Sequence, residues 1–376
     1  MKAFIRTLLT LTLAAAVGCG GSSATPATIA FVYAVGQGSN NIFNFKQISD
    51  GELQSSSVFA TATLPRPVAM TLHPSRNFLY VANLTSNAVS GFSVDHTSGV
   101  LSPVGTAIPP ISLSPAAQPI ALGINSGGQF LFVLTQGAPT AIPAVPPGIS
   151  ILNIDARGLL TAAGSAATGA NPQSMVVSPN SGTLYVSSGS PTATTISGFA
   201  IASNGALTPI GGDFTGPAAT NIAGMTIDSK GQFLYAADSG NNTVLCFSIA
   251  AGGALTPVAG SPFAAGTQPV SVAVDSNNAF LYTANKGSND ISAFTVKAGV
   301  LTAVNGSPFP ATTSGATTPA QPIFLTVDPT NQFVYIGDSG TSNIFAYAIS
   351  ITDGSLVAVT NAPFGGVGAS SIIITK

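Results

Sequence analysis

The chain has 376 residues, of which only 10 are basic and 12 acidic, while 41 are glycine and 27 are proline. So little charge argues against a helical protein, because the exposed faces of helices are usually built from Glu, Lys and Arg. We expect instead many short strands joined by turns. Without Lys2 and Arg6 of the amino-terminal segment the formal charge is about −4, which argues against nucleic acid and anionic membrane surfaces as partners.

The amino-terminal segment, residues 1–18, has the features of a signal peptide. Lys2 and Arg6 precede an apolar stretch from Leu8 to Val17 that is too short to span a bilayer as a mature helix. The sequence Ala-Val-Gly-Cys that ends at Cys19 resembles a bacterial lipobox, in which a lipid is attached to the cysteine. We therefore predict an exported protein of the cell envelope, held to a membrane only through a lipid on Cys19. An ordinary secretory signal is the alternative. Residues 19–28, rich in Gly, Ser and Thr, are predicted to be a flexible tether.

One unit recurs along the rest of the chain, and its clearest copy is "QPVSVAVDSNNAFLYTANKGSNDISAFTVKAGVLTAVNGSP", Gln268 to Pro308. The aromatic residue of the "FLY" step is its most regular feature, at intervals of 47 to 53 residues. Self-similarity at this period is typical of repeat architectures. The anchors are Tyr33, Tyr80, Phe132, Tyr185, Tyr235, Tyr282 and Tyr335.

Each unit contains four short segments that alternate small, β-branched and polar residues between turn residues, which predicts a four-stranded antiparallel meander. Seven meanders of about 50 residues indicate a single all-β domain, a seven-bladed β-propeller over residues 29–376. Cys246, in "VLCFSI", is predicted to be a small buried residue.

The ring is predicted to close through the carboxyl terminus. A first strand precedes every anchor except Tyr33. The missing copy is "ASSIIIT" near the end of the chain, where Ile372 and Ile374 match Val272 and Val274 of the repeat. This strand should pair with "AFVYAV" of the first blade, and deleting Ser370 to Lys376 should open the ring.

At this point the repeats resemble those of a known family. "HPSRNFLYVANLTSNAVSGFSVD" and "DPTNQFVYIGDSGTSNIFAYAI" are similar to the repeats of seven-bladed propellers of the lactonase family, which are 6-phosphogluconolactonase-like and related to YVTN-type surface propellers. The resemblance covers the chain from about Ile29 onward. It implies the fold, and it implies lactone chemistry only where matching channel residues exist, because the shared residues shape blades and turns.

The upper face of the predicted ring carries the loops between second and third strands and the loops between blades. Four long insertions belong to this face: residues 107–117, 137–148, 189–195 and 310–320. Residues that begin first strands or end second strands are predicted to surround the channel mouth there, where they either bind a ligand or tie turns and neighbouring blades together. They are Asn83, Gln118, Asn171, Asn221, Gln268, Asn285 and Gln321, with Arg66, Asp238 and Asp338 as the ionisable members.

Two functions remain open from sequence, and a purely structural surface protein, which differs from the first only in lacking a defined ligand, is a third. His73, His96 and Glu52 fall on the lower face, so the histidine and glutamate expected of lactone chemistry are away from the mouth. The first interpretation is therefore a binding or scaffold module for a polar small molecule, glycan or protein. The alternative is a lactone hydrolase that acts on a non-phosphorylated lactone and uses Arg66 with Asp238 or Asp338. No motif for a metal or cofactor is found, and a monomer is expected.

Overall fold

The computed structural model describes residues 27–36, 38, 40–105, 111–113, 117–138, 144–180, 182–190, 193–214, 221–311, 320–365 and 368–375. The predicted signal peptide and Cys19 lie outside these residues, as do most of the predicted tether and part of each long insertion. Across the described ranges no helix is long and apolar enough to cross a membrane.

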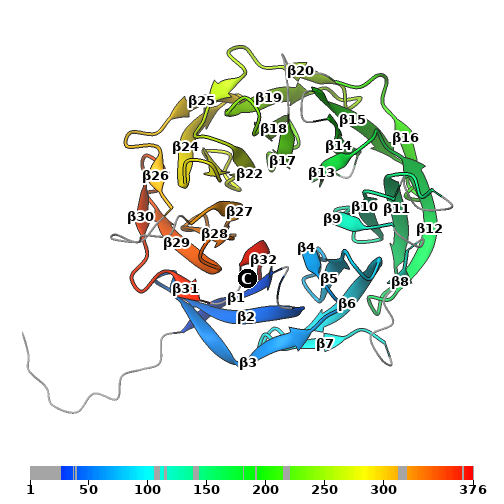
Figure 1. The fold of residues 1–376 in the computed structure, drawn as a ribbon, viewed down its shortest axis with the longest axis horizontal. Coiled ribbons are helices and arrows are strands. Elements are labelled where there is room, and N and C mark those ends of the chain that lie inside the picture. The colour runs from blue at the N-terminus through cyan, green and yellow to red at the C-terminus, as the bar shows by residue number, and fades with distance from the viewer. Residues whose placement is uncertain are drawn as a thin grey trace, which may run out of the picture.

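The described strands form seven sheets arranged in a ring, numbered here as blades 1 to 7 along the chain (Figure 1). Each blade has four antiparallel strands that run in order from the centre of the ring to its rim (Figure 1). Strand alternation places apolar side chains on both faces of every sheet, where they pack against the neighbouring blades. The predicted seven-bladed, all-β propeller is confirmed.

The first four blades have the following strands. Blade 1 contains β32 (Ala369–Thr375), β1 (Thr28–Gly36), β2 (Asn41–Ile48) and β3 (Leu53–Ala62). Blade 2 contains β4 (Pro67–Leu72), β5 (Phe78–Asn83), β6 (Ala88–Val94), β7 (Leu101–Pro103) and the short β8 (Ile111–Ser112). Blade 3 contains β9 (Pro119–Ile124), β10 (Phe130–Thr135), β11 (Gly148–Ile154) and β12 (Leu160–Ala167). Blade 4 contains β13 (Pro172–Val177), β14 (Thr183–Ser190), β15 (Ala193–Ile201) and β16 (Leu207–Pro209).

The last three blades each add a short fifth strand beside the third. Blade 5 contains β17 (Ile222–Ile227), β18 (Phe233–Asp238), β19 (Thr243–Ile249), β20 (Leu255–Pro257) and β21 (Phe263–Ala264). Blade 6 contains β22 (Pro269–Val274), β23 (Phe280–Asn285), β24 (Asp290–Lys297), β25 (Val300–Ala303) and β26 (Phe309–Pro310). Blade 7 contains β27 (Pro322–Val327), β28 (Phe333–Asp338), β29 (Asn343–Ile349), β30 (Leu356–Ala358) and β31 (Phe364–Gly365).

The ring closes within blade 1, where the carboxyl-terminal strand β32 pairs antiparallel with β1. The pairing of these two strands is as predicted, and its register runs from Phe31 opposite Thr375 to Gly36 opposite Ala369. Ile372 is buried in a cluster that also contains side chains of blade 7, and Ile374 is partly buried against the same cluster. The hydrophobic end of the chain is therefore the innermost strand of the first blade.

The anchor aromatics connect neighbouring blades, and all seven are fully buried. Tyr335 of blade 7 donates from its hydroxyl to the carbonyl oxygen of Gly51 in blade 1, at 2.9 Å. Gly51 has φ +86°, and a Cβ there would lie 2.3 Å from the ring of Phe333, so the joint requires glycine. The same hydroxyl-to-glycine bond is made by Tyr33, Tyr80, Tyr185 and Tyr282.

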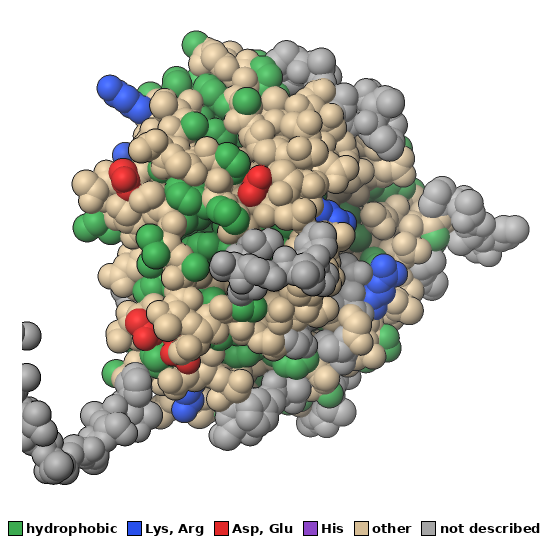
Figure 2. Space-filling model, turned by 60° about the vertical axis from the view of Figure 1, so that its left-hand side comes forward, with side chains coloured by type: hydrophobic (Ala, Val, Ile, Leu, Met, Phe, Trp, Pro, Cys, Tyr) green, Lys and Arg blue, Asp and Glu red, His purple; other side chains and the backbone are tan. Residues whose placement is uncertain are grey.

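Little charge is left on the outside of this assembly. Figure 2 shows few charged side chains on one side of the ring, where apolar and other uncharged groups cover most of the surface. Cys246 is fully buried in the cluster between blades 5 and 6, which confirms its predicted role as a small core residue.

Candidate functional site at the mouth of the central channel

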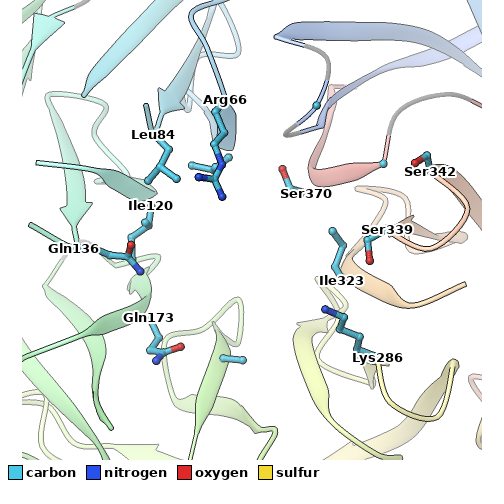
Figure 3. A pocket seen from close by; sticks show the side chains of 14 residues that line it. Arg66, Leu84, Ile120, Gln136, Gln173, Lys286, Ile323, Ser339, Ser342 and Ser370 are labelled. Carbon is cyan, nitrogen blue, oxygen red and sulfur yellow. The ribbon is translucent and has the colours of Figure 1, made fainter. Parts of the chain in front are cut away.

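A large cavity lies on the upper face, at the mouth of the channel that the inner strands surround. It has a volume of about 920 Å³, within the usual range for ligand sites. Arg66, Gln136, Gln173 and Lys286 are the longest polar side chains that line it, and Figure 3 shows Arg66 and Lys286 directed into it from different sides. No Asp, Glu or His is among the described residues that line this cavity.

A ring of seven residues forms the neck below the mouth. In every blade the pairing of the inner strand with the next strand is interrupted by one residue near the upper end of the inner strand. Such a bulge redirects a side chain, and here each bulged residue lines the channel. We call this set the bulge ring: Val68, Ile120, Gln173, Ala223, Val270, Ile323 and Ser370.

Arg66 reaches the mouth because its backbone is held in an unusual conformation. Its φ is +58°, its N–H donates to Oδ1 of Asn40 at 2.9 Å, and its carbonyl oxygen accepts from the N–H of Leu84 at 2.9 Å. Oδ1 of Asn87 accepts from Gln118 N–H in the same way. Gln268 and Gln321 are held alike by Asn242 and Asn289. The residue that begins each of these turns is therefore fixed by an asparagine of the preceding blade.

These four asparagines, which accept the N–H of a mouth residue of the next blade, were not identified from the sequence. Asn40, Asn87, Asn242 and Asn289 all have positive φ and each comes directly before a third strand. The recurrence of Asn at that place in "TSNAV", "GNNTV" and "GSNDI" is the signal that could have identified them. They position the mouth and do not line it.

The predicted amide set lies around the mouth but supplies none of the residues that line the cavity. Gln118 and Asn221 are partly buried, whereas Asn171, Gln268 and Gln321 are exposed. Asn83 and Asn285 are fully buried and donate to side chains of their own blades, Ser90 and Ser292 respectively. Their geometry is that of groups that satisfy turns and strand ends.

Asp238 and Asp338 also lie within their blades and do not line the cavity. Both are fully buried. Asp238 accepts from the N–H groups of Asn221 at 3.0 Å and Gly240 at 3.2 Å. Asp338 accepts from the N–H of Gly340 at 2.8 Å and from Thr341. Each carboxylate caps the turn after its second strand, and neither is among the described residues that line the cavity.

Lys286 is the cation that sequence reasoning missed. It directly follows Asn285, the last residue of β23, so it lies one residue beyond the predicted position. Its side chain is partly buried in the cavity wall. Its signal in the sequence was the single Lys in "TANKGSND", at a place where other copies carry Leu84, Gln136 or Ser339.

The remaining ionisable groups of the prediction lie in turns other than those that form the mouth. His73 donates from Nε2 to the carbonyl oxygen of Gly128 at 2.9 Å, and His96 donates from Nε2 to Oδ1 of Asn77 at 3.0 Å. Glu52 accepts from Asn361 at 3.4 Å. In the described part of the chain no group of three His, Cys, Asp or Glu could hold a metal ion.

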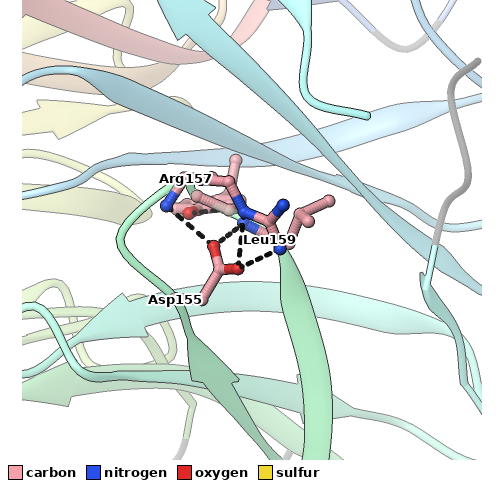
Figure 4. Close-up of polar contacts among 5 residues, drawn as sticks. Asp155, Arg157 and Leu159 are labelled. Atoms are coloured by element: carbon pink, nitrogen blue, oxygen red, sulfur yellow. Dashed lines mark hydrogen bonds and ion pairs between the residues drawn. The ribbon is translucent and has the colours of Figure 1, made fainter. Parts of the chain in front are cut away.

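The ion pair found among the described residues is also away from the mouth, in the turn between β11 and β12. Arg157 Nη2 lies 3.2 Å from Asp155 Oδ2 (Figure 4). The N–H of Leu159, which donates to Asp155 at 2.8 Å, is the main reason that the pKa of this carboxyl is lowered. The pair supports an exposed turn.

The model of the family described as "Lactonase, 7-bladed beta-propeller" matches residues 23–112 and 224–369, well over half of the chain. The chain belongs to this lactonase family. The match leaves out residues 113–223, which hold blades 3 and 4. Comparison with the curated proteins found no match.

Solved structures support the same fold across nearly the whole chain. A candidate 6-phosphogluconolactonase from Bacteroides fragilis is 17% identical with a TM-score of 0.73, and the alignment covers 94% of this chain and 100% of that one. A second candidate 6-phosphogluconolactonase, from Bacteroides uniformis, is 18% identical with a TM-score of 0.74, over 92% and 99% of the two chains. The periplasmic gluconolactonase of Pseudomonas aeruginosa is 16% identical with a TM-score of 0.74, again over 92% and 99%. At these identities the likeness establishes the fold alone.

Proposed function

We propose that this member of the lactonase family is a lactone hydrolase whose active site is the mouth cavity. The observation that carries the proposal is that two cations, Arg66 and Lys286, line one cavity from different blades. The names of the structural neighbours, which include a gluconolactonase, support lactone chemistry over the scaffold interpretation.

The reaction places negative charge where these cations can meet it. A water oxygen bonds to the carbonyl carbon of the lactone, and the carbonyl oxygen becomes an oxyanion in the tetrahedral intermediate. The ring C–O bond then breaks, the ring oxygen takes up a proton to become a hydroxyl, and the other product group is a carboxylate. Arg66 or Lys286 stabilises the oxyanion and then the carboxylate. At neutral pH one proton is released to solvent for each ring opened.

The described lining offers no general base. Water must therefore lose its proton to solvent or enter as hydroxide. We expect kcat/KM to rise with hydroxide concentration across the neutral range and not to follow a bell-shaped profile.

The test is proton release at constant pH from δ-valerolactone and glucono-δ-lactone, with Arg66→Gln and Lys286→Gln beside the unchanged protein. Gln is the sound replacement for Arg66, because Gln118, Gln268 and Gln321 hold the same positive φ in other blades, whereas Ala would add strain there. Loss of a preorganised donor to the oxyanion is expected to lower kcat about a hundredfold.

The matched control is Lys297→Gln, which removes one exposed positive charge at the end of β24 that does not line the cavity. It should keep the full rate. Rates at the uncatalysed background for the unchanged protein, or equal rates in all four proteins, would overturn the proposal.

A second candidate is binding of a carboxylate-bearing ligand without turnover, which the lack of a described base in the lining favours. Here gluconate should bind the unchanged protein by calorimetry, binding should weaken in Arg66→Gln, and no lactone should be opened. Measurable turnover that depends on Arg66 would exclude this candidate.

We also propose that the chain is exported and carries a lipid on Cys19, on the evidence of its first 19 residues. In a bacterial host with lipoprotein processing, radioactive palmitate should label the protein, and Cys19→Ala should abolish labelling. An unlabelled protein that retains Met1 would show that both steps are absent.

A further inference from the structure

Gln173 is one of two polar residues in the bulge ring, and the other five are Val, Ile or Ala. The second polar residue, Ser370, already donates its hydroxyl to the carbonyl oxygen of Val35 at 3.2 Å. The side-chain amide of Gln173 makes no hydrogen bond to another described residue. It is exposed, and Figure 3 shows it directed into the cavity. Its acceptor and its two donors are therefore available to a molecule in the cavity.

The backbone of blade 4 presents this amide to the channel. The pairing of β13 with β14 shifts between Pro172 and Ser174, so Gln173 is the bulged residue and its side chain is redirected. Pro172 is buried, and the N–H of Ser174 donates to Oγ of Ser187 at 3.1 Å. Both neighbours of Gln173 are thus fixed in the blade. The amide is held at the neck by the fold, and not by side-chain contacts of its own.

Gln173 also lines a second cavity, of about 370 Å³, that continues from the mouth into the channel. The lining of this second cavity includes Ser174, Ser271 and Ser371 beside apolar residues. A cavity of this size with polar groups in its wall can hold water. Gln136, the other amide of the mouth lining, does not line the second cavity. Gln173 therefore lies where water in the channel meets a ligand in the mouth.

The position of Gln173 around the ring is separate from both cations. It belongs to blade 4, whereas Arg66 directly precedes β4 of blade 2 and Lys286 directly follows β23 of blade 6. A water that attacks a carbonyl group approaches the carbon from one face of the group, and not along the C=O bond. The group that holds the water must therefore lie apart from the group that holds the carbonyl oxygen. Gln173 meets this requirement for either cation.

We propose that Gln173 is a catalytic residue that holds the attacking water. This inference rests on the proposed function and adds a residue to its mechanism. Oε1 of Gln173 accepts a hydrogen bond from the water, which directs a lone pair of the water oxygen to the carbonyl carbon of a lactone bound at a cation. The water oxygen bonds to that carbon, and the ring oxygen leaves and takes up a proton. The proton that the carboxylic acid loses goes to solvent, because an amide cannot accept it.

The first test is Gln173→Ala with δ-valerolactone, a substrate that has no hydroxyl group for the amide to bind. We expect kcat to fall about tenfold, which is the effect of one hydrogen bond lost from the transition state. KM should stay at the value of the unchanged protein, because the amide holds water and not the lactone. Glucono-δ-lactone should show the same loss in kcat. Melting temperatures confirm that the variant is folded.

The sharper test replaces the amide with a base of the same shape. In the unchanged protein kcat/KM should rise about tenfold for each pH unit across the neutral range, because the reaction requires hydroxide. Gln173→Glu supplies a carboxylate, with an ordinary pKa of about 4.3, that can take the proton of the water. Its kcat/KM should be level between about pH 6 and pH 8, and about tenfold above that of the unchanged protein at pH 6.

The matched control is Gln268→Glu, which makes the same change at an exposed residue outside the cavity lining. Its kcat/KM should keep the rise with hydroxide.

The outcomes separate the two proposals. If the unchanged protein opens neither lactone, the hydrolase proposal fails and the inference fails with it. If hydrolysis depends on Arg66 but Gln173→Ala keeps the full rate, the inference is wrong and the hydrolase proposal stands. A loss confined to KM for glucono-δ-lactone would make Gln173 a contact for a substrate hydroxyl and overturn the inference. A rate that still rises tenfold for each pH unit in Gln173→Glu would overturn it too.

Discussion

Blades 5 to 7 and blades 3 and 4 share the same four-stranded topology but differ in the residues that cap their first turns. In blades 5 to 7 a buried aspartate caps the turn between the first two strands: Asp228, Asp275 and Asp328. Blade 3 has Asn125 there, which also accepts a backbone N–H, and blade 4 has Ser178, whose buried hydroxyl has no partner among the described atoms.

The outer edges differ as well. Blades 5 to 7 have outer strands of three or four residues and a short fifth strand, whereas blade 3 ends in the exposed eight-residue β12, with no fifth strand among its described residues. The family match omits blades 3 and 4. The difference teaches that caps and fifth strands are separable from the core of the blade, which needs only strand alternation and aromatic anchors.

The largest effect should come from removing the strand that closes the ring, because blades 5 to 7 and blades 3 and 4 all depend on ring closure. Deletion of Ser370 to Lys376 removes most of β32, including Ile372, and leaves the edge of β1 unpaired. We expect aggregation through that edge and loss of the cooperative melting transition. Size-exclusion chromatography and thermal unfolding measure both, with deletion of Lys376 alone as the control. A monomeric truncated protein with an unchanged melting temperature would show that closure does not depend on β32.

The next test compares the turn caps of the two regions. Asp328→Ala leaves the backbone N–H groups of Gln332 and Phe333 without their acceptor, which lies 2.7 Å from each, and should cost about 3 kcal/mol. Ser178→Ala removes a buried hydroxyl that has no described partner and should cost nothing measurable. Denaturant unfolding measures both. Equal losses would mean that the aspartate caps are not what distinguishes blades 5 to 7.

A smaller effect is expected at the joints between blades. Tyr335→Phe removes the bond to Gly51 and should lower the free energy of unfolding by about 1 kcal/mol. Tyr235→Phe is the matched control, since its buried hydroxyl has no partner in the described residues, and Phe132 shows that the ring alone is tolerated at an anchor. If both variants lose the same free energy, the hydroxyl-to-glycine bond contributes nothing specific.

The smallest expected effect is the chemical reactivity of Cys246, which lies in β19 of blade 5. Burial is the main cause that raises the pKa of its thiol to about 12, and the charge of Asp228 adds to it. The group therefore stays protonated at pH 8 and should not react with iodoacetamide in the native protein, in a Cys19→Ser background. Full labelling should appear only in denaturant. Rapid labelling of the native protein would reveal that blades 5 and 6 open.

Much of the fold could be predicted from the sequence because it depends on periodic features. Seven aromatic anchors gave the blade number, and "ASSIIIT" matched the first strands in pattern, so the closure followed. The candidate site was harder. Arg66, which the sequence analysis placed at the mouth, lines the cavity, but Lys286 was missed, and Asp238 and Asp338, which were grouped with Arg66, are buried in their blades.

The sequence by itself therefore determined the number of blades, the order of the strands and the way the ring closes, since apolar alternation and turn residues repeat in every copy. Only the tertiary structure decided which residue of each copy faces the channel. A bulge in every inner strand, preceded two positions earlier in six of the blades by a left-handed residue, shifts the alternation at the mouth. At the end of the second strand of blade 6, the adjacent residues Asn285 and Lys286 also have opposite environments, one buried in the blade and one in the cavity wall.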